Sequence, residues 1–188
     1  LRALAKAFPQ AQITYLTLPW LREFAARYPY LHRVEAIPPY PQIHVPSEAD
    51  SPPAESADAF FSRMQAERFD LAIQMHGGGA DSNPFVLRLG ARHTLGLTAP
   101  GAMPLEHNLR YVYYQPEVIR YLELLGKLGV PWDGLDMDVP ILAADLARLA
   151  EVWRPQATPY AVLHAGAGDP RRRWPVERFA RVAEHLHE

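Results

Sequence analysis

The sequence contains no cysteine, which excludes disulfide bonds and thiolate ligands to a metal ion. Its eight histidines show no spacing typical of metal ligands, so we expect no metal site. No apolar run approaches the ~20 residues that a membrane-spanning helix needs. The formal net charge of -2 gives no reason to expect nucleic acid as a partner. The remaining composition, 48% hydrophobic and 21% charged in 188 residues, is typical of a soluble globular protein.

The two commonest nucleotide-binding motifs, GxxxxGKS/T and GxGxxG, are also absent. The C-terminal part nevertheless contains an apolar run, Tyr160–His164, that predicts a buried strand, followed by a glycine turn at residues 164–168 that another molecule could approach closely. Three arginines come next, and Pro175 suits the first turn of a helix. Helix-start N–H groups and fork-shaped guanidinium groups both favour a phosphate group. These residues predict a phosphate or nucleotide site, with a solvated surface loop as the alternative.

A second glycine turn, residues 76–79, follows the apolar run Phe69–Met75, which predicts a strand in the middle of a parallel sheet. The sequence His-Gly-Gly-Gly also forms the oxyanion hole of lipase-like hydrolases. That function needs a G-x-S-x-G nucleophile turn, which the sequence lacks. A tight turn that needs positive φ angles is the purely structural interpretation.

Predicted strands and helices alternate along the chain, which favours an α/β fold with a doubly wound parallel sheet. Ligands of such sheets bind beyond the carboxyl ends of the strands, where both glycine turns are expected. The predicted strands are residues 11–18, 32–37, 69–75, 94–97 and 160–164, and the predicted helices are residues 1–8, 19–27, 57–68, 83–89, 116–128, 141–153 and 175 onward.

Two segments carry no clear pattern of helix or strand. Residues 38–56 are rich in proline and predict a long surface loop, which is commonly functional in a compact domain. A substrate-side flap, a membrane-facing surface and a variable loop without function are the three options. Residues 98–115 predict mostly loop. At the start of the chain, apolar residues already share a helical face, so we expect Leu1 to lie inside a helix.

The C-terminal stretch resembles the start of the second domain in glycosyltransferase family 9, the ADP-heptose:lipopolysaccharide heptosyltransferases. The shared features are a strand, a His/Gly-rich turn, a basic residue two positions before Trp-Pro, and a helix. Here they are Val162-Leu163-His164, Gly166-Ala-Gly168, Arg172, Trp174-Pro175 and Phe179-Ala180. The basic residue is commonly lysine in the family. Degenerate similarity extends through Leu1–Leu4, Phe8-Pro9, Ile13-Thr14, Phe69–Leu71, His76-Gly77, Tyr121-Leu122 and Leu128-Gly129.

The resemblance implies a GT-B-like fold of two Rossmann-like domains with the active site in the cleft between them. It assigns residues 1–153 to an acceptor-side Rossmann-like domain that lacks its first strand and ends in a linking helix. Residues 154–188 would then be the linker and the beginning of the donor domain. The family inverts the sugar configuration as it transfers a heptose from ADP-heptose to a lipopolysaccharide core acceptor. It uses no cofactor and no essential metal in the chemical step, and it implies a cytoplasmic protein, optionally in peripheral contact with the inner membrane face.

The resemblance also suggests roles for particular residues. The expected catalytic base is an aspartate in a loop that would precede Leu1, so we expect the 188-residue chain alone to be inactive. A non-catalytic nucleotide-sugar or glycan-binding protein, and a transferase with another nucleotide sugar, stay open as alternatives. The predicted donor and phosphate contacts are His164, Gly166, Ala167, Gly168, Arg171, Arg172, Arg173 and Trp174, and the predicted acceptor-side contacts are His76, Gly77, Gly78, Gly79, Asp81 and Ser82.

Overall fold

The computed structural model describes residues 1–46, 55–153, 159–167 and 170–187. The chain divides into two compact units, residues 1–140 and residues 141–188. The predicted first domain, residues 1–153, includes the linking helix at residues 141–153, whereas the observed division places these residues in the second unit. The division into acceptor and donor domains stays a prediction.

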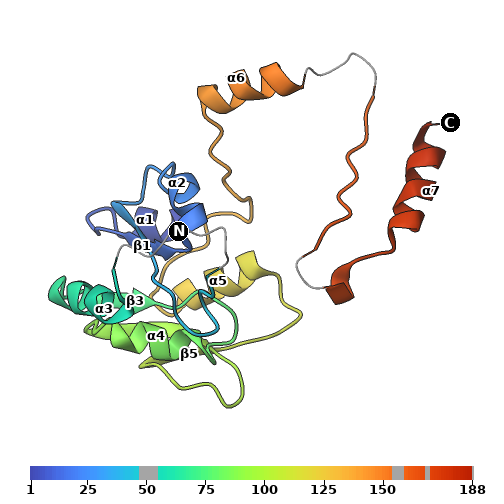
Figure 1. The fold of residues 1–188 in the computed structure, drawn as a ribbon. Helices are drawn as coiled ribbons and strands as arrows, with labels where there is room; N and C mark the ends of the chain where they lie inside the picture. Colours follow the sequence, from blue (N-terminus) through green and yellow to red (C-terminus); the bar gives the residue numbers. More distant parts are fainter. Residues whose placement is uncertain (47–54, 154–158, 168–169, 188) are drawn as a thin grey trace. The chain divides into compact units, whose positions relative to one another are not determined.

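Helices and strands alternate along the first unit, as the sequence predicts, except that the last strand follows its predecessor without a helix between them (Figure 1). Most predicted elements form. In chain order they are α1 (Arg2–Ala7), β1 (Thr14–Thr17), the 3-10 turn η1 (Pro19–Leu21), α2 (Arg22–Ala25), β2 (Arg33–Ala36), α3 (Ala57–Ala66), β3 (Leu71–Ile73), α4 (Ser82–Arg88), β4 (His93–Thr98), β5 (His107–Arg110) and α5 (Glu117–Gly126). Of the predicted strands, β1, β2 and β3 are shorter than predicted and β4 is longer.

The strands form two parallel sheets, which confirms the predicted α/β class. β1 pairs with β2, and a three-stranded sheet has the order β3-β4-β5. The sequence predicted that Phe69–Met75 would form a central strand of the sheet. In the described sheet, however, β3 is an edge strand and β4 is the central strand. β5 falls in a segment that was predicted to be mostly loop. The sequence did not predict this strand because its residues do not alternate between hydrophobic and polar, and only Leu109 is partly buried.

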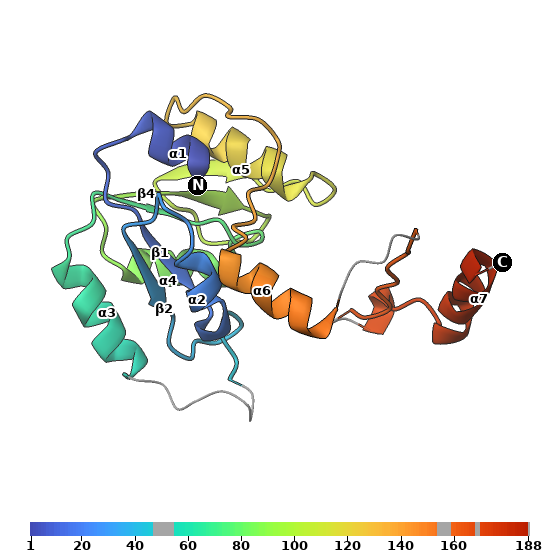
Figure 2. The same ribbon diagram turned by 90° about the horizontal axis from the view of Figure 1, so that it is seen from above.

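Helices pack on both sides of the three-stranded sheet. Alternate residues of β4, Leu95 and Leu97, are fully buried and pack with Leu124 of α5. Ala3 of α1 joins the α5 cluster, and Figure 2 shows these two helices side by side. A second cluster joins α3 and α4 to the strands through Phe60, Phe61, Met64, Ala72, Phe85, Val86 and Leu89. The first unit therefore has a layer of helices on each face of the three-stranded sheet, and loops lie at the ends of its strands.

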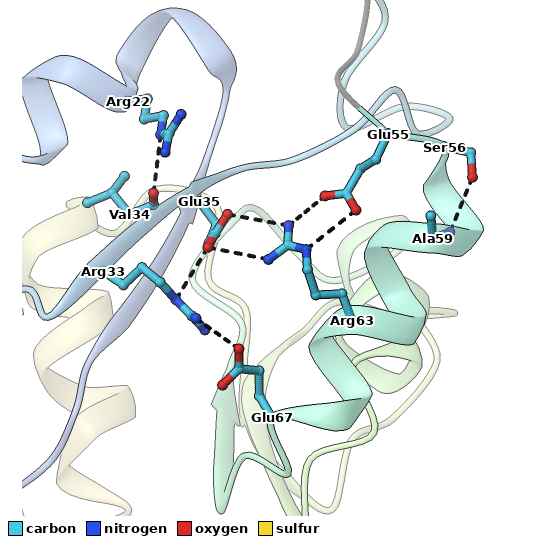
Figure 3. Close-up of polar contacts among 9 residues, drawn as sticks. All are labelled: Arg22, Arg33, Val34, Glu35, Glu55, Ser56, Ala59, Arg63 and Glu67. Carbon is cyan, nitrogen blue, oxygen red and sulfur yellow. Dashed lines mark hydrogen bonds and ion pairs between the residues drawn. The ribbon is translucent and has the colours of Figure 1, made fainter.

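The proline-rich loop is anchored at both of its described ends, and residues 47–54 lie outside the described part. At its start, the ring of Tyr40 packs edge-on against Phe85 with centroids 5.0 Å apart, and the buried His44 ring contacts the Ile37 carbonyl at 3.0 Å. At its end, Arg63 of α3 pairs with Glu55 and, at 3.3 Å, with Glu35 of β2. Figure 3 shows how this arginine bridges the loop to the strand. The loop's function stays a prediction.

The same close-up explains how α3 begins and how it attaches to β2. The Ser56 hydroxyl oxygen accepts a hydrogen bond of 3.2 Å from the Ala59 N–H, which satisfies a free donor at the helix start. Arg33 of β2 donates to the carboxylate of Glu67, just beyond α3, at 2.8 Å (Figure 3). These charged contacts are partly exposed, so they orient the helix more than they stabilise it.

The second unit contains α6 (Ala143–Val152), the 3-10 turn η2 (Pro170–Arg172) and α7 (Val176–His187). The predicted buried strand at residues 160–164 is wrong, because these residues are exposed and have no regular structure. A strand must satisfy its N–H and C=O groups on a neighbour. The described part of this unit contains no second strand to supply one.

Candidate functional site

The loops that follow β3, β4 and β5 meet at one edge of the sheet, because parallel strands share the direction of their carboxyl ends. The Ala99 N–H, beyond β4, donates to the Gly78 carbonyl at 2.7 Å, and the Tyr111 N–H, beyond β5, donates to the Thr98 carbonyl at 3.0 Å. Backbone hydrogen bonds therefore join the glycine turn to the loop after β4, and the residue after β5 to the end of β4.

Gln74 holds the glycine turn from the interior. This side chain is 2% exposed, and its amide nitrogen donates to the His76 carbonyl and to the Ser82 hydroxyl. Its amide oxygen accepts a hydrogen bond of 2.9 Å from the Leu97 N–H of β4. The Ser82 hydroxyl in turn donates to the His76 carbonyl at 2.9 Å. The turn is thus fixed by a buried polar network with its partners in place.

Two of the three glycines in the turn are closely packed. A methyl group at Gly78 would lie 2.7 Å from the Cβ of Ala99, and one at Gly79 would lie 2.4 Å from both the Leu97 carbonyl and the Asn83 amide nitrogen. Gly77 differs, because a methyl group there would meet nothing within 4 Å. Gly77 and Gly79 also have positive φ angles of 57° and 87°, as the structural interpretation of this turn requires.

The predicted acceptor-side residues therefore fall into two environments. His76 and Asp81 are exposed, whereas Ser82 is 6% exposed and hydrogen-bonded within the turn. Their roles toward an acceptor stay predictions.

Arg120 of α5 was not predicted, although it is the largest fully buried side chain described. Its guanidinium donates to the carbonyls of Val112 and Gln115 at 2.6 and 2.8 Å, and to that of Tyr113 at 3.3 Å. It also pairs with the Glu117 carboxylate. A lone arginine on an apolar helix gives no sequence signal of burial, because its partners belong to a loop that the sequence does not position.

The acid–base groups around Arg120 are perturbed. Burial would raise the pKa of the Glu117 carboxyl, but hydrogen bonds from Tyr121 and Arg120, together with nearby His76, hold that pKa below its ordinary value. Burial and the hydrogen bond to Glu117 raise the pKa of the Tyr121 hydroxyl.

The predicted donor-side residues lie in the second unit. The Arg173 Nε donates to the Ala167 carbonyl at 2.8 Å, so one arginine of the cluster is tied to the glycine turn that precedes it. Arg171 and Arg172 lie on η2, and His164 and Gly166 are exposed. Gly168 lies outside the described residues. The Trp174 ring packs edge-on against Phe179 of α7, with centroids 5.0 Å apart.

The described part of the chain holds no group of three or more His, Asp or Glu side chains suited to a metal ion. Within the same residues, no helix combines the length and the apolar character that crossing a membrane requires.

A family model supplies the decisive comparison. The model of glycosyltransferase family 9 (heptosyltransferase) matches residues 58–188, which is more than half of the chain. The chain belongs to glycosyltransferase family 9. The match begins at α3 and includes both glycine turns, while the resemblance noted for residues 1–57 lies outside it. The parallel α/β fold agrees with the Rossmann-like GT-B architecture of the family. Searches of curated proteins and of solved structures found no match.

Membership in this family makes the protein a glycosyltransferase, which takes a sugar from a donor and passes it to an acceptor.

Proposed function

We propose that this protein is an inverting glycosyltransferase that moves a heptose from ADP-heptose to a lipopolysaccharide core acceptor. The observation that carries the proposal is the match to the heptosyltransferase family over residues 58–188. The proposed enzyme needs no cofactor beyond its ADP-sugar donor. It would work in the cytoplasm, with peripheral contact at the inner membrane face where its acceptor is lipid-linked.

The chemistry needs positive charge on the departing diphosphate and a base for the acceptor hydroxyl. For the first role we propose Arg171, Arg172 and Arg173, with the turn at residues 164–168. Support comes from the hydrogen bond between Arg173 and Ala167, which ties the cluster to the turn. For the second role we propose a residue preceding Leu1. The 188-residue chain should therefore show no transfer, and an assay that detected turnover by this chain would refute that location.

The test of the donor site is calorimetric titration of ADP, UDP and GDP into the full-length gene product. We expect selective ADP binding, weakened about tenfold to a hundredfold in Arg172→Ala, because a charge-assisted hydrogen bond contributes ~1.5–3 kcal/mol. Arg172→Lys should recover part of the loss, since it keeps the charge without the fork. The matched control is Arg181→Ala on α7, which removes an exposed arginine of the same unit.

Each outcome has a distinct meaning. Equal losses in the Arg172 and Arg181 variants would show a general charge effect and remove Arg172 from the site. Selective binding of UDP or GDP would replace the donor and keep the enzyme class. No binding of any of the three nucleotides would favour a non-catalytic protein.

A further inference from the structure

The loop between β5 and α5, which begins at the carboxyl end of β5, exposes a pair of aromatic side chains. Tyr113 is 74% exposed and Tyr114 is 93% exposed. Their rings are nearly perpendicular, with centroids 5.0 Å apart. Scattered exposed apolar residues are ordinary, but adjacent aromatic rings at the edge where parallel sheets bind their ligands need an explanation.

Buried contacts fix the backbone that carries these rings. Arg120 donates to the carbonyls of the residues on both sides of the pair, Val112 and Gln115, and to that of Tyr113 itself. Hydrogen bonds from a terminal nitrogen of a buried guanidinium to three loop carbonyls favour one conformation of the loop. The rings are therefore presented on a rigid backbone, which lowers the entropy cost of binding.

The same arginine connects the loop to the glycine turn. Its guanidinium lies over the Tyr111 ring, 4.3 Å from the centroid, which is a close cation–π distance. A methyl group at Gly78 would lie 3.4 Å from that ring, so Tyr111 packs directly on the turn backbone. Tyr111 thus lies between the turn and Arg120. Arg120 in turn holds the carbonyls of the loop that carries the exposed pair.

We propose that Tyr113 and Tyr114 bind a sugar ring of the acceptor saccharide by stacking, and that Arg120 positions them. This inference rests on the proposed transferase function. The C–H face of a pyranose packs on an aromatic ring, while the tyrosine hydroxyls can exchange hydrogen bonds with the sugar hydroxyls. A sugar fits better than a nucleotide base, because the predicted nucleotide contacts lie in the other unit, at residues 164–174.

The experiment titrates two probes into the full-length gene product: ADP, and the core oligosaccharide released from lipopolysaccharide by deacylation. We expect Tyr113→Leu and Tyr114→Leu each to weaken oligosaccharide binding about twofold to tenfold, by analogy with the energy of an aromatic ring contact. The corresponding Phe variants should keep most of the affinity, since they keep the ring. The matched control is Trp132→Leu, which removes an exposed aromatic ring from the segment after α5.

Arg120→Lys tests the positioning role. It should weaken oligosaccharide binding and leave ADP affinity unchanged, at a temperature where circular dichroism shows the variant folded. A residue that acts only on overall stability would change neither affinity under those conditions. Equal oligosaccharide affinity in this variant and in the wild type would overturn its role.

The outcomes separate this inference from the function on which it rests. Wild-type binding of both probes with unchanged oligosaccharide affinity in the Leu variants overturns the stacking surface and keeps the transferase. Wild-type binding of ADP alone overturns the surface and the acceptor class together. Loss of ADP affinity in the Leu variants would assign the pair to the nucleotide base instead, which also overturns the proposal.

Discussion

Gly79→Ala should be among the most damaging single-methyl changes in the first unit. Its φ of 87° costs a residue with a Cβ about 1–2 kcal/mol. The added methyl would also lie 2.4 Å from the Leu97 carbonyl and from the Asn83 amide, and relieving such overlap in a packed site costs about 1–3 kcal/mol. If Asn83 moves, its hydrogen bond to Leu97 weakens by about 1 kcal/mol more. The expected loss is therefore about 3–6 kcal/mol.

Gly77→Ala is the matched control, because it has the same chemistry in the same turn, with a φ of 57° and no atom within 4 Å of the new methyl. It should cost only the backbone penalty of about 1–2 kcal/mol. Urea unfolding of both variants and the wild type, followed by circular dichroism, measures the difference. Two variants within about 1 kcal/mol of each other would refute the claim that close packing decides this position.

Two further variants test the hydrogen bonds that hold the glycine turn at residues 76–79 and the ion pairs that hold α1. Gln74→Leu should destabilise the protein by about 2–4 kcal/mol in urea unfolding, because it leaves the buried Leu97 N–H without a partner and removes one of the two side-chain hydrogen bonds to the His76 carbonyl. Hydrogen bonds from Lys6 and Arg2 lower the pKa of Asp133, so its contribution is present above the ordinary carboxyl pKa and is lost as the pH falls through the lowered value. Asp133→Asn should therefore lose less thermal stability than the wild type between pH 5 and pH 2, and equal losses would contradict this.

Periodicity predicted the elements that carry a strong apolar face. α3 buries Phe60, Phe61 and Met64, and α5 buries Leu122 and Leu125, as their spacing indicates. The strand predicted at residues 160–164 failed because an apolar run reports burial only when a neighbour exists to pair with it. The opposite error occurred at β5, which pairs through its backbone although its side chains are mostly exposed. Strand pairing depends on residues that are far apart in the sequence, so it cannot be predicted from the local pattern of hydrophobic residues.

The candidate site shows the same division between local and long-range information. Histidine and glycine mark both turns in the sequence, and three arginines follow the second turn. Gln74 and Arg120 gave no signal, because each resembles a surface residue until its partner is placed. Those partners include Leu97, 23 positions away from Gln74, and the Val112 carbonyl, 8 positions away from Arg120.

The structural and functional interpretations of the first glycine turn apply to different residues of it. Gly78 and Gly79 are explained by close packing against Ala99 and Leu97, and Ser82 by the buried network, so their identities require no ligand. Gly77 has a positive φ of 57° but open space over its Cα, and His76 is exposed beside it. Packing explains a glycine only where something fills the space that a side chain would take. A ligand approaching this turn would therefore meet His76 and Gly77 first.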